Sequence, residues 1–184
     1  QELTFSGPNW SSLCTGADFC KHTVTTNGFG GNSLDVFPHF FKYLEQARPQ
    51  KNTVSVVNWT EINEDIASTF ADYAPTESIN DNEVFTIANN LLNQGSPLVP
   101  DVLFLQFDEL DATGHDYGFS PDVVEYTDYI ATLDGYIESL MSIINAKRLS
   151  GEDWLVCIIS DHGGSGKSHG GKYDNEHVRH TIMY

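Results

Sequence analysis

Three short, continuous apolar runs constrain the fold of this chain more than any other feature. They are rich in β-branched and aromatic residues, and they span Thr53–Val57, Val102–Phe107 and Leu155–Ile159. Runs of this length without polar alternation are typical of strands that are covered on both faces, as in a parallel sheet. We therefore expect each run to form a buried strand.

Helical patterns occupy the segments between the runs. Pro38 can stand in the first turn of a helix that Pro49 stops. Asp81 is expected to cap a second helix, with Gly95 as its terminator. Both patterns place a helix between or before predicted strands, as crossover connections require.

The longest helical pattern follows Ser120 and Pro121. Apolar residues recur there at three- and four-residue spacing from Val123 to Ile144, and we interpret this amphipathic stripe as core packing. Strands and helices therefore alternate along the chain. This order predicts an α/β domain with a mainly parallel sheet.

Carboxylates and imidazoles follow two of the predicted strands. Asp111 and His115 lie after the second run, and Asp161, His162 and His169 lie after the third, in a glycine-rich loop. Ligands of parallel sheets collect beyond the carboxyl ends of the strands. A single Asp/His pair would be an ordinary turn, but five such residues at two strand ends favour a site for Zn²⁺ or Mn²⁺.

Charge and hydropathy exclude several classes of protein. The chain has 26 acidic residues against 9 Lys plus Arg, a net charge of −17, whereas nucleic-acid binders and proteins drawn to anionic membranes need clustered cations. No stretch approaches the roughly 18 uninterrupted apolar residues of a transmembrane helix. An apolar content of 40% is sufficient for a packed core. We expect a globular domain without a nucleic-acid-binding surface.

Cysteines and glycosylation sequons bear on the compartment. Cys14 and Cys20 could close a short disulfide, which would imply an oxidising environment. The alternative is three free thiols, with Cys157 as a small core residue. Two Asn-x-Ser/Thr sequons begin at Asn9 and Asn58. Together these features favour an extracellular or lumenal protein.

Nothing intrinsic to the N-terminal segment selects Ser6 as a nucleophile, because a hydroxyl is weak unless a base or metal activates it. The motifs of the whole chain are more specific when they are taken in order. They are Ser6-x-Pro-Asn, Thr15-Gly16, His22, Asn27, Asp111-x-x-x-His115, Asp161-His162-Gly163 and His169-Gly170-Gly171. This set resembles the alkaline phosphatase superfamily, and within it the type I phosphodiesterase / nucleotide pyrophosphatase branch. The likeness covers nearly the whole chain.

The resemblance implies a mechanism for phosphate-ester or nucleotide substrates. Ser6 matches the nucleophile, whose oxygen also contacts one metal ion, and Asn27 matches an amide that hydrogen-bonds a phosphoryl oxygen. A phosphoseryl intermediate would form and then be hydrolysed by water. The substrate could be a diester, a nucleotide or a monoester.

The resemblance also implies two divalent ions, zinc or else manganese. Asp111, His115 and His169 match the ligands of one ion, and Asp161 and His162 match ligands of the other. The family uses a further Asp at the end of a first strand that would precede the nucleophile. We therefore expect this chain to be part of a single alkaline-phosphatase-like three-layer α/β domain, lacking its first strand and its C-terminal continuation.

Other members of the superfamily fit less well. A sulfatase is disfavoured because Trp10 stands where its motif requires Arg, and the large insert of cofactor-independent phosphoglycerate mutases is absent after Ser6. A different class stays open, namely a non-catalytic extracellular structural or binding module that retains the fold. The intact set of ligand residues argues against that alternative.

Overall fold

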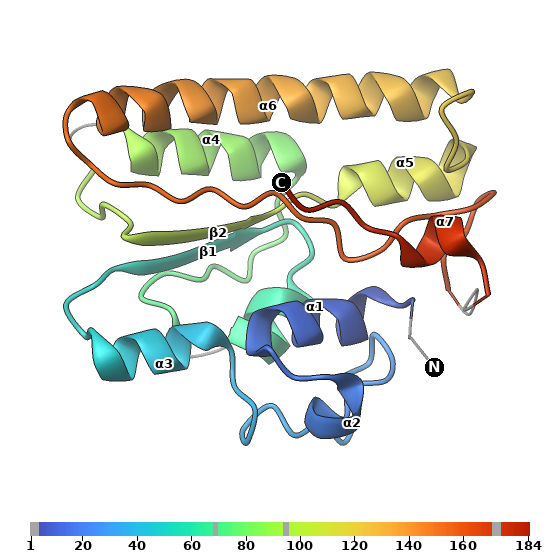
Figure 1. Ribbon diagram of the computed structural model, residues 1–184, viewed down its shortest axis with the longest axis horizontal. Helices are drawn as coiled ribbons and strands as arrows, with labels where there is room; N and C mark the ends of the chain where they lie inside the picture. The colour runs from blue at the N-terminus through green and yellow to red at the C-terminus, as the bar shows by residue number, and fades with distance from the viewer. Residues whose placement is uncertain (1–3, 68–69, 94–95, 171–173) are drawn as a thin grey trace.

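The computed structural model describes residues 4–67, 70–93, 96–170 and 174–184. Figure 1 labels its α-helices and strands. In chain order the elements are α1 (Ser6–Thr15), α2 (Phe19–His22), α3 (Phe40–Ala47), β1 (Thr53–Val57), the π-helix η1 (Ile62–Ala67), α4 (Asp81–Leu92), β2 (Val102–Gln106), α5 (Glu109–Tyr117), α6 (Val124–Leu149) and α7 (Glu176–Arg179).

The sheet consists of β1 and β2, which pair in parallel from Thr53 opposite Val102 to Val57 opposite Gln106. Every residue of β1 is buried, as expected for a strand covered on both faces. The first two predicted strands are therefore confirmed, with β2 ending one residue before the predicted end. The connection between the strands contains α4, so the α/β prediction with a parallel sheet is also confirmed.

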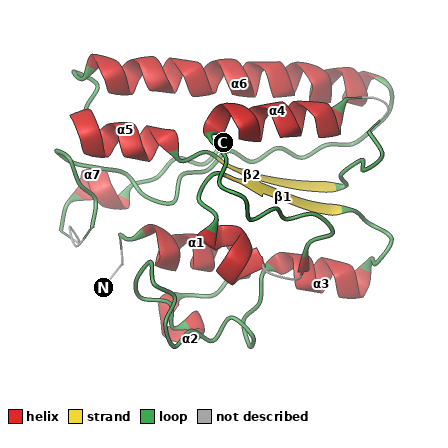
Figure 2. Cartoon of the chain, turned by 180° about the vertical axis from the view of Figure 1, so that it is seen from behind, coloured by secondary structure: helices red, strands yellow, loops and turns green. Residues whose placement is uncertain are grey.

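Helices lie on both sides of the sheet and produce three layers (Figures 1 and 2). The helices α4, α5 and α6 lie on one side, and α1, α2 and α3 lie on the other. Val54 and Val56 pack with Val84 of α4, whereas Val57 packs with Trp10 in a separate core cluster. This two-residue alternation along β1 supplies apolar surface to both layers.

The third apolar run does not join this sheet in the part of the chain that the structure describes. Its segment is extended, and Ile158 exchanges two backbone hydrogen bonds of 2.9 Å with Tyr184. Val156 packs against the α4–α6 core cluster, but the side chain of Leu155 is 87% exposed. The prediction of a buried strand at Leu155–Ile159 is wrong, because only one face of this segment is covered.

The predicted helix starts are close to the observed ones. The first predicted helix is confirmed as α3, which begins at Phe40. Its N-cap residue is His39, whose ring accepts a hydrogen bond from Phe41 N at 3.1 Å. The helix α4 is also confirmed, but its N-cap is Asn80, which forms a reciprocal capping box with Glu83. Asp81 therefore does not cap its own helix. The predicted terminator of α4 lies outside the described residues.

The long helix α6 is confirmed, but its predicted stripe is buried over only part of its length. Leu140 and Ile144 are buried against α4, and α6 contacts both α4 and α5. Towards the start of the helix, Val123 and Tyr126 of the stripe are half-buried, and Ile130 is 46% exposed. The interpretation of the whole stripe as core packing is therefore wrong at Ile130. None of the described helices has the length and apolarity to cross a lipid bilayer.

The predicted disulfide is absent, because the described residues Cys14 and Cys20 are both free thiols. Cys14 lies within the core cluster around α1, whereas Cys20 is exposed on α2, so the two side chains occupy different environments. Burial raises the pKa of the Cys14 thiol to about 12. Cys157 is exposed, so the alternative prediction of a small core residue is wrong there too.

Candidate metal centre

The first part of the candidate site lies on α5. This helix begins directly after β2 and Asp108, and it places Asp111 and His115 four residues apart on one face. His115 Nε2 lies 3.3 Å from Asp111 Oδ2. The sequence predicted ligands in this segment, but it did not predict that the segment is helical.

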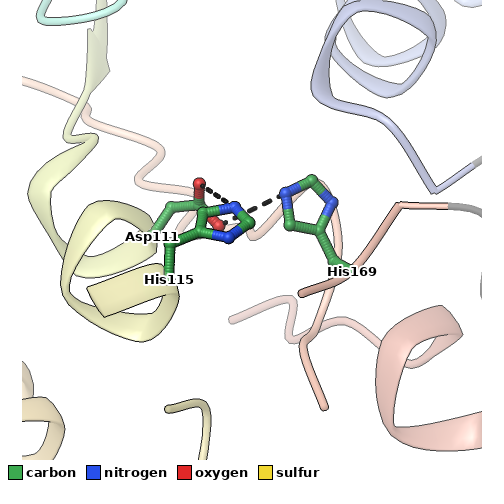
Figure 3. A group of neighbouring side chains, drawn as sticks. All are labelled: Asp111, His115 and His169. Carbon is green, nitrogen blue, oxygen red and sulfur yellow. Dashed lines mark ion pairs between the residues drawn. The ribbon is translucent and has the colours of Figure 1, made fainter. Parts of the chain in front are cut away.

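A third side chain reaches this pair from the glycine-rich loop. His169 Nε2 lies 3.6 Å from Asp111 Oδ1, and the ligand atoms of Asp111, His115 and His169 all lie within 4.8 Å of one another. Figure 3 shows the two imidazoles converging on the carboxylate from different segments of the chain. These three residues are the group that the resemblance implied for one metal ion.

Main-chain carbonyl groups orient the histidine rings. His115 Nδ1 lies 3.0 Å from the carbonyl oxygen of Lys167, and His169 Nδ1 lies 2.6 Å from that of Thr4. His162 Nδ1 lies 3.0 Å from the carbonyl oxygen of the next residue. A carbonyl can only accept, so each Nδ1 carries the proton and each Nε2 keeps a lone pair for a metal ion or a proton. This arrangement is typical of metal-binding imidazoles.

Asp161, His162 and Ser6 form a second group beside the first. His162 Nε2 lies 3.4 Å from Asp161 Oδ2 and 3.2 Å from Ser6 Oγ. The rings of His162 and His169 stack with their centroids 3.6 Å apart, so the two groups are contiguous. Burial, and secondarily a charge on His169, lowers the pKa of His162 to about 4. His162 is therefore neutral near pH 7.

The carboxylates of both groups lack sufficient compensation for their charge. Asp111 Oδ1 and Asp161 Oδ2 are buried and have no hydrogen-bond partner among the described residues. Burial raises the pKa of both groups, well above the usual range for Asp161, and the charge of Asp111 adds to the effect on Asp161. Buried acceptors without donors require an explanation, and a bound cation supplies one. Carboxylate oxygens and neutral imidazoles suit Zn²⁺ or Mn²⁺, so these residues fit a metal centre.

The start of α1 places Ser6 and Asn27 next to each other. Ser6 is the first residue of α1, and the backbone N–H of Gly7 donates to Asn27 Oδ1 at 2.8 Å. A Cβ atom on Gly7 would lie 2.9 Å from the carbonyl oxygen of Thr26, so only glycine permits this approach. Within the described residues Asn27 Nδ2 has no partner, and it can donate to a ligand beside Ser6.

The two sequon asparagines donate hydrogen bonds within the fold. Asn9 Nδ2 donates to the carbonyl oxygen of Asp161 at 2.9 Å, and Asn58 Nδ2 donates to Asp81 Oδ1 at 2.8 Å. A glycan on either nitrogen would have to displace or share these bonds. Glycosylation at Asn9 and Asn58 stays a prediction, which these contacts disfavour.

Sequence reasoning missed Asp108, which lies between β2 and α5. Burial raises its pKa to about 6, and the nearby charges of Asp111, Asp81 and Glu61 add to the effect, although a hydrogen bond from Gln106 opposes it. The available signal was its position directly after an apolar run, where ligands of parallel sheets collect. Asp108 increases the negative charge that a cation would offset.

Comparisons with known proteins bear on the family and the fold of the chain. Residues 3–179 match the family described as type I phosphodiesterase / nucleotide pyrophosphatase. A search of curated proteins finds no match. Among solved structures, the chain is similar to murine ectonucleotide pyrophosphatase / phosphodiesterase 5, in an inactive form in complex with AMP, with 20% identity and a TM-score of 0.61. The match covers 88% of this chain and 46% of that structure, so this chain spans about half of its length.

Proposed function

The chain belongs to the type I phosphodiesterase / nucleotide pyrophosphatase family, and from this premise we propose that it carries a metal-dependent centre for phosphate-ester hydrolysis. One observation carries the proposal. Ser6 Oγ lies 3.2 Å from the neutral His162 Nε2, beside two buried carboxylate oxygens that have no donor among the described residues. A hydroxyl next to a cation site is the arrangement that makes serine a nucleophile.

The residues available for metal ions fall into the two groups described above. Asp111, His115 and His169 would hold one divalent ion, and Asp161 and His162 would hold a second. Zinc suits this donor set, and manganese is the alternative. Bound divalent ions would lower the pKa of a nearby hydroxyl and offset charge on the phosphoryl group.

The chain's own residues would then divide the chemistry at phosphorus. Ser6 Oγ would release its proton to water and attack the phosphorus atom. A bond from Ser6 to phosphorus would form, the bond to the ester oxygen of the leaving group would break, and that oxygen would take a proton from water. Asn27 Nδ2 donates to a non-bridging oxygen, and its position is fixed because its other amide atom accepts from Gly7 N. Water then hydrolyses the phosphoseryl group and restores the hydroxyl.

We propose a nucleotide or a related phosphodiester as the substrate class. The solved relative binds AMP, which supports a nucleoside phosphate at the corresponding place. The net charge of −17 would repel such an anion unless cations offset the carboxylates at the site. The relative is also named an ectonucleotide enzyme, which supports an extracellular or lumenal location for this protein. We further propose that these residues form part of one larger alkaline-phosphatase-like domain.

The test is hydrolysis by the full-length protein of three chromogenic esters, with and without a chelator. They are p-nitrophenyl phosphate, bis-p-nitrophenyl phosphate and the p-nitrophenyl ester of thymidine monophosphate. We expect turnover of the two diesters, loss of turnover after chelation, and a decrease of at least about a thousandfold for Ser6→Ala, because the covalent route is removed. Full activity of Ser6→Ala would refute the nucleophile. Inactivity of the metal-loaded wild type on all three esters would favour the non-catalytic module.

A further inference from the structure

Asp81 is a fully buried carboxylate that lies outside the metal centre and accepts hydrogen bonds from three other segments. Its Oδ1 atom accepts from Asn58 Nδ2 and from Asp108 N, each at 2.8 Å. Its Oδ2 atom accepts from Glu109 N at 3.1 Å and lies 3.0 Å from the hydroxyl oxygen of Tyr129, which shares its single proton with Glu109 Oε2 at 2.5 Å. Asn58 directly follows β1, and Tyr129 belongs to α6. The two backbone N–H groups are those of the N-cap and the first residue of α5.

The helix that carries the first two metal-ligand candidates has no cap of its own. Asp108 occupies the N-cap position of α5, and its side chain makes no capping hydrogen bond. The first N–H groups of a helix need acceptors, and Asp81 provides them for Asp108 and Glu109. Asp81 can do this because Asn80 and Glu83 already cap its own helix α4.

The charge of Asp81 is also suited to this position. The residue stands in the first turn of α4 and accepts from the first N–H groups of α5, so its carboxylate lies at the positive ends of two helix dipoles. A buried carboxylate is costly unless donors surround it. Here a neutral apolar residue would leave the start of α5 without an acceptor, so the carboxylate is needed to accept the hydrogen bonds of its first N–H groups.

We propose that Asp81 is a positioning residue for the metal centre, fixing the start of α5 and thereby the positions of Asp111 and His115. Asp111 stands in the first turn of α5, with its N–H donating to the carbonyl of Asp108 at 3.0 Å. A shift of that turn would change the 3.6 Å separation between Asp111 Oδ1 and His169 Nε2. The inference rests on the metal binding in the proposed function.

The experiment compares two neighbouring substitutions in the full-length protein. Asp81→Asn retains the size of the side chain but replaces one acceptor oxygen with an NH₂ donor. That donor would face N–H groups, which are donors themselves. Asn80→Ala is the matched control, because it weakens the start of α4, and within the described residues the Asn80 side chain hydrogen-bonds to Glu83 of that helix and to no residue of α5. Each variant is stripped with a chelator and titrated with Zn²⁺ by calorimetry, and its Tm is measured by circular dichroism.

We expect Asp81→Asn to bind Zn²⁺ about 10–100-fold more weakly than the wild type, the loss typical of groups that orient ligands. Asn80→Ala should lower the Tm by about 2–4 °C and leave the affinity within about threefold. The visible spectrum of the Co²⁺-substituted protein should change only in Asp81→Asn, because only that variant moves ligands. Equal affinity losses in both variants, or wild-type affinity in folded Asp81→Asn, would overturn the inference.

A second variant decides the question if Asp81→Asn does not fold. Asn58→Ala removes one donor of Asp81, the hydrogen bond of 2.8 Å from Asn58 Nδ2 to Asp81 Oδ1, and should weaken Zn²⁺ binding in the same direction by about two- to fivefold; unchanged affinity there would overturn the inference. A wild type that binds Zn²⁺ but hydrolyses no ester would refute the proposed function alone, and the variant affinities would still decide this inference. A wild type that binds no Zn²⁺ would refute both.

Discussion

The two halves of the candidate metal centre are positioned by different means. In the helix half, Asp111 and His115 share a regular element, so their separation follows from helix geometry. In the loop half, Asp161, His162 and His169 lie in a segment that has only isolated bridges. A helix needs few outside contacts to be placed, whereas a loop must be fixed at many points. Single substitutions should therefore be more harmful in the loop half.

The largest effect is expected from Gly163→Ala, in the loop half. A Cβ atom at this position would lie 2.0 Å from the carbonyl oxygen of His177 and 3.0 Å from that of His180, and neither backbone group can rotate away. We expect a loss of about 3 kcal/mol or more in the free energy of unfolding, measured with urea, and loss of Zn²⁺ binding.

The matched control is Gly135→Ala, because nothing lies within 4 Å of a Cβ atom at that position in α6. This control should raise the free energy of unfolding by up to about 1 kcal/mol, since alanine favours a helix more than glycine does. If Gly163→Ala unfolds at the wild-type urea concentration, the loop half is not packed as described.

Acid should change the contributions of His162 and Asp108 to the stability of the metal-free protein in opposite directions. The pKa of His162 is lowered to about 4, so between pH 6.5 and 4 the unfolded chain binds a proton that the folded chain does not. Stability from His162 therefore falls as pH falls through this window, by up to about 3 kcal/mol at pH 4. The pKa of Asp108 is raised to about 6, so its contribution to stability rises as pH falls below 6.

Urea unfolding between pH 7 and pH 4 tests both signs. His162→Gln should make the decrease in stability towards pH 4 shallower, and Asp108→Asn should make it steeper. His39→Asn is a control outside the centre, since burial lowers the pKa of His39 to about 4 and asparagine can still accept from Phe41 N. The His39→Asn variant should show a shallower decrease in stability towards pH 4, with an unchanged affinity for Zn²⁺. Identical pH profiles for all four proteins would contradict the assignment.

The smallest effect is expected from Gly114→Ala in the helix half. A Cβ atom here would lie 2.2 Å from Phe119 Cε1, but a side chain can move and alanine favours the helix. We expect a loss of about 1–2 kcal/mol in the free energy of unfolding and a modest loss of Zn²⁺ affinity, because the Phe119 ring also contacts His115 and His169. Adding Phe119→Leu should recover part of the loss. If Gly114→Ala lowers the free energy of unfolding as much as Gly163→Ala does, the helix half is as sensitive to substitution as the loop half, and the expected difference between them is wrong.

The sequence predicted the elements whose signals are local. The strand β1 is a continuous β-branched run, and α4 has polar capping residues directly before its apolar positions. The helix α5 was not predicted as a helix, because its acceptor is Asp81, which lies 27 residues before Asp108. Its cap is therefore a long-range contact. The prediction of a buried strand at Leu155–Ile159 was wrong for a related reason, since an apolar run does not reveal which other elements will cover its two faces.

The candidate site was predicted in composition and not in geometry. Spacing and family resemblance indicated Asp111, His115 and His169, and the structure brings these three together. Their roles as ligands stay predictions, as do those of Ser6 and Asn27. Neither spacing nor resemblance could indicate Asp81, because its function depends on donors that only the folded backbone supplies.

The orientation of the imidazole rings has a consequence for mutational studies. The acceptors of His115 and His169 are the main-chain carbonyls of Lys167 and Thr4, and every residue type has this group. Replacing either of these two side chains leaves the acceptor atom in place. A survey of all single substitutions would therefore identify the histidines and overlook the atoms that orient them. The ring orientation is encoded in the path of the backbone, and replacing one amide by an ester would weaken an acceptor that no codon change can remove.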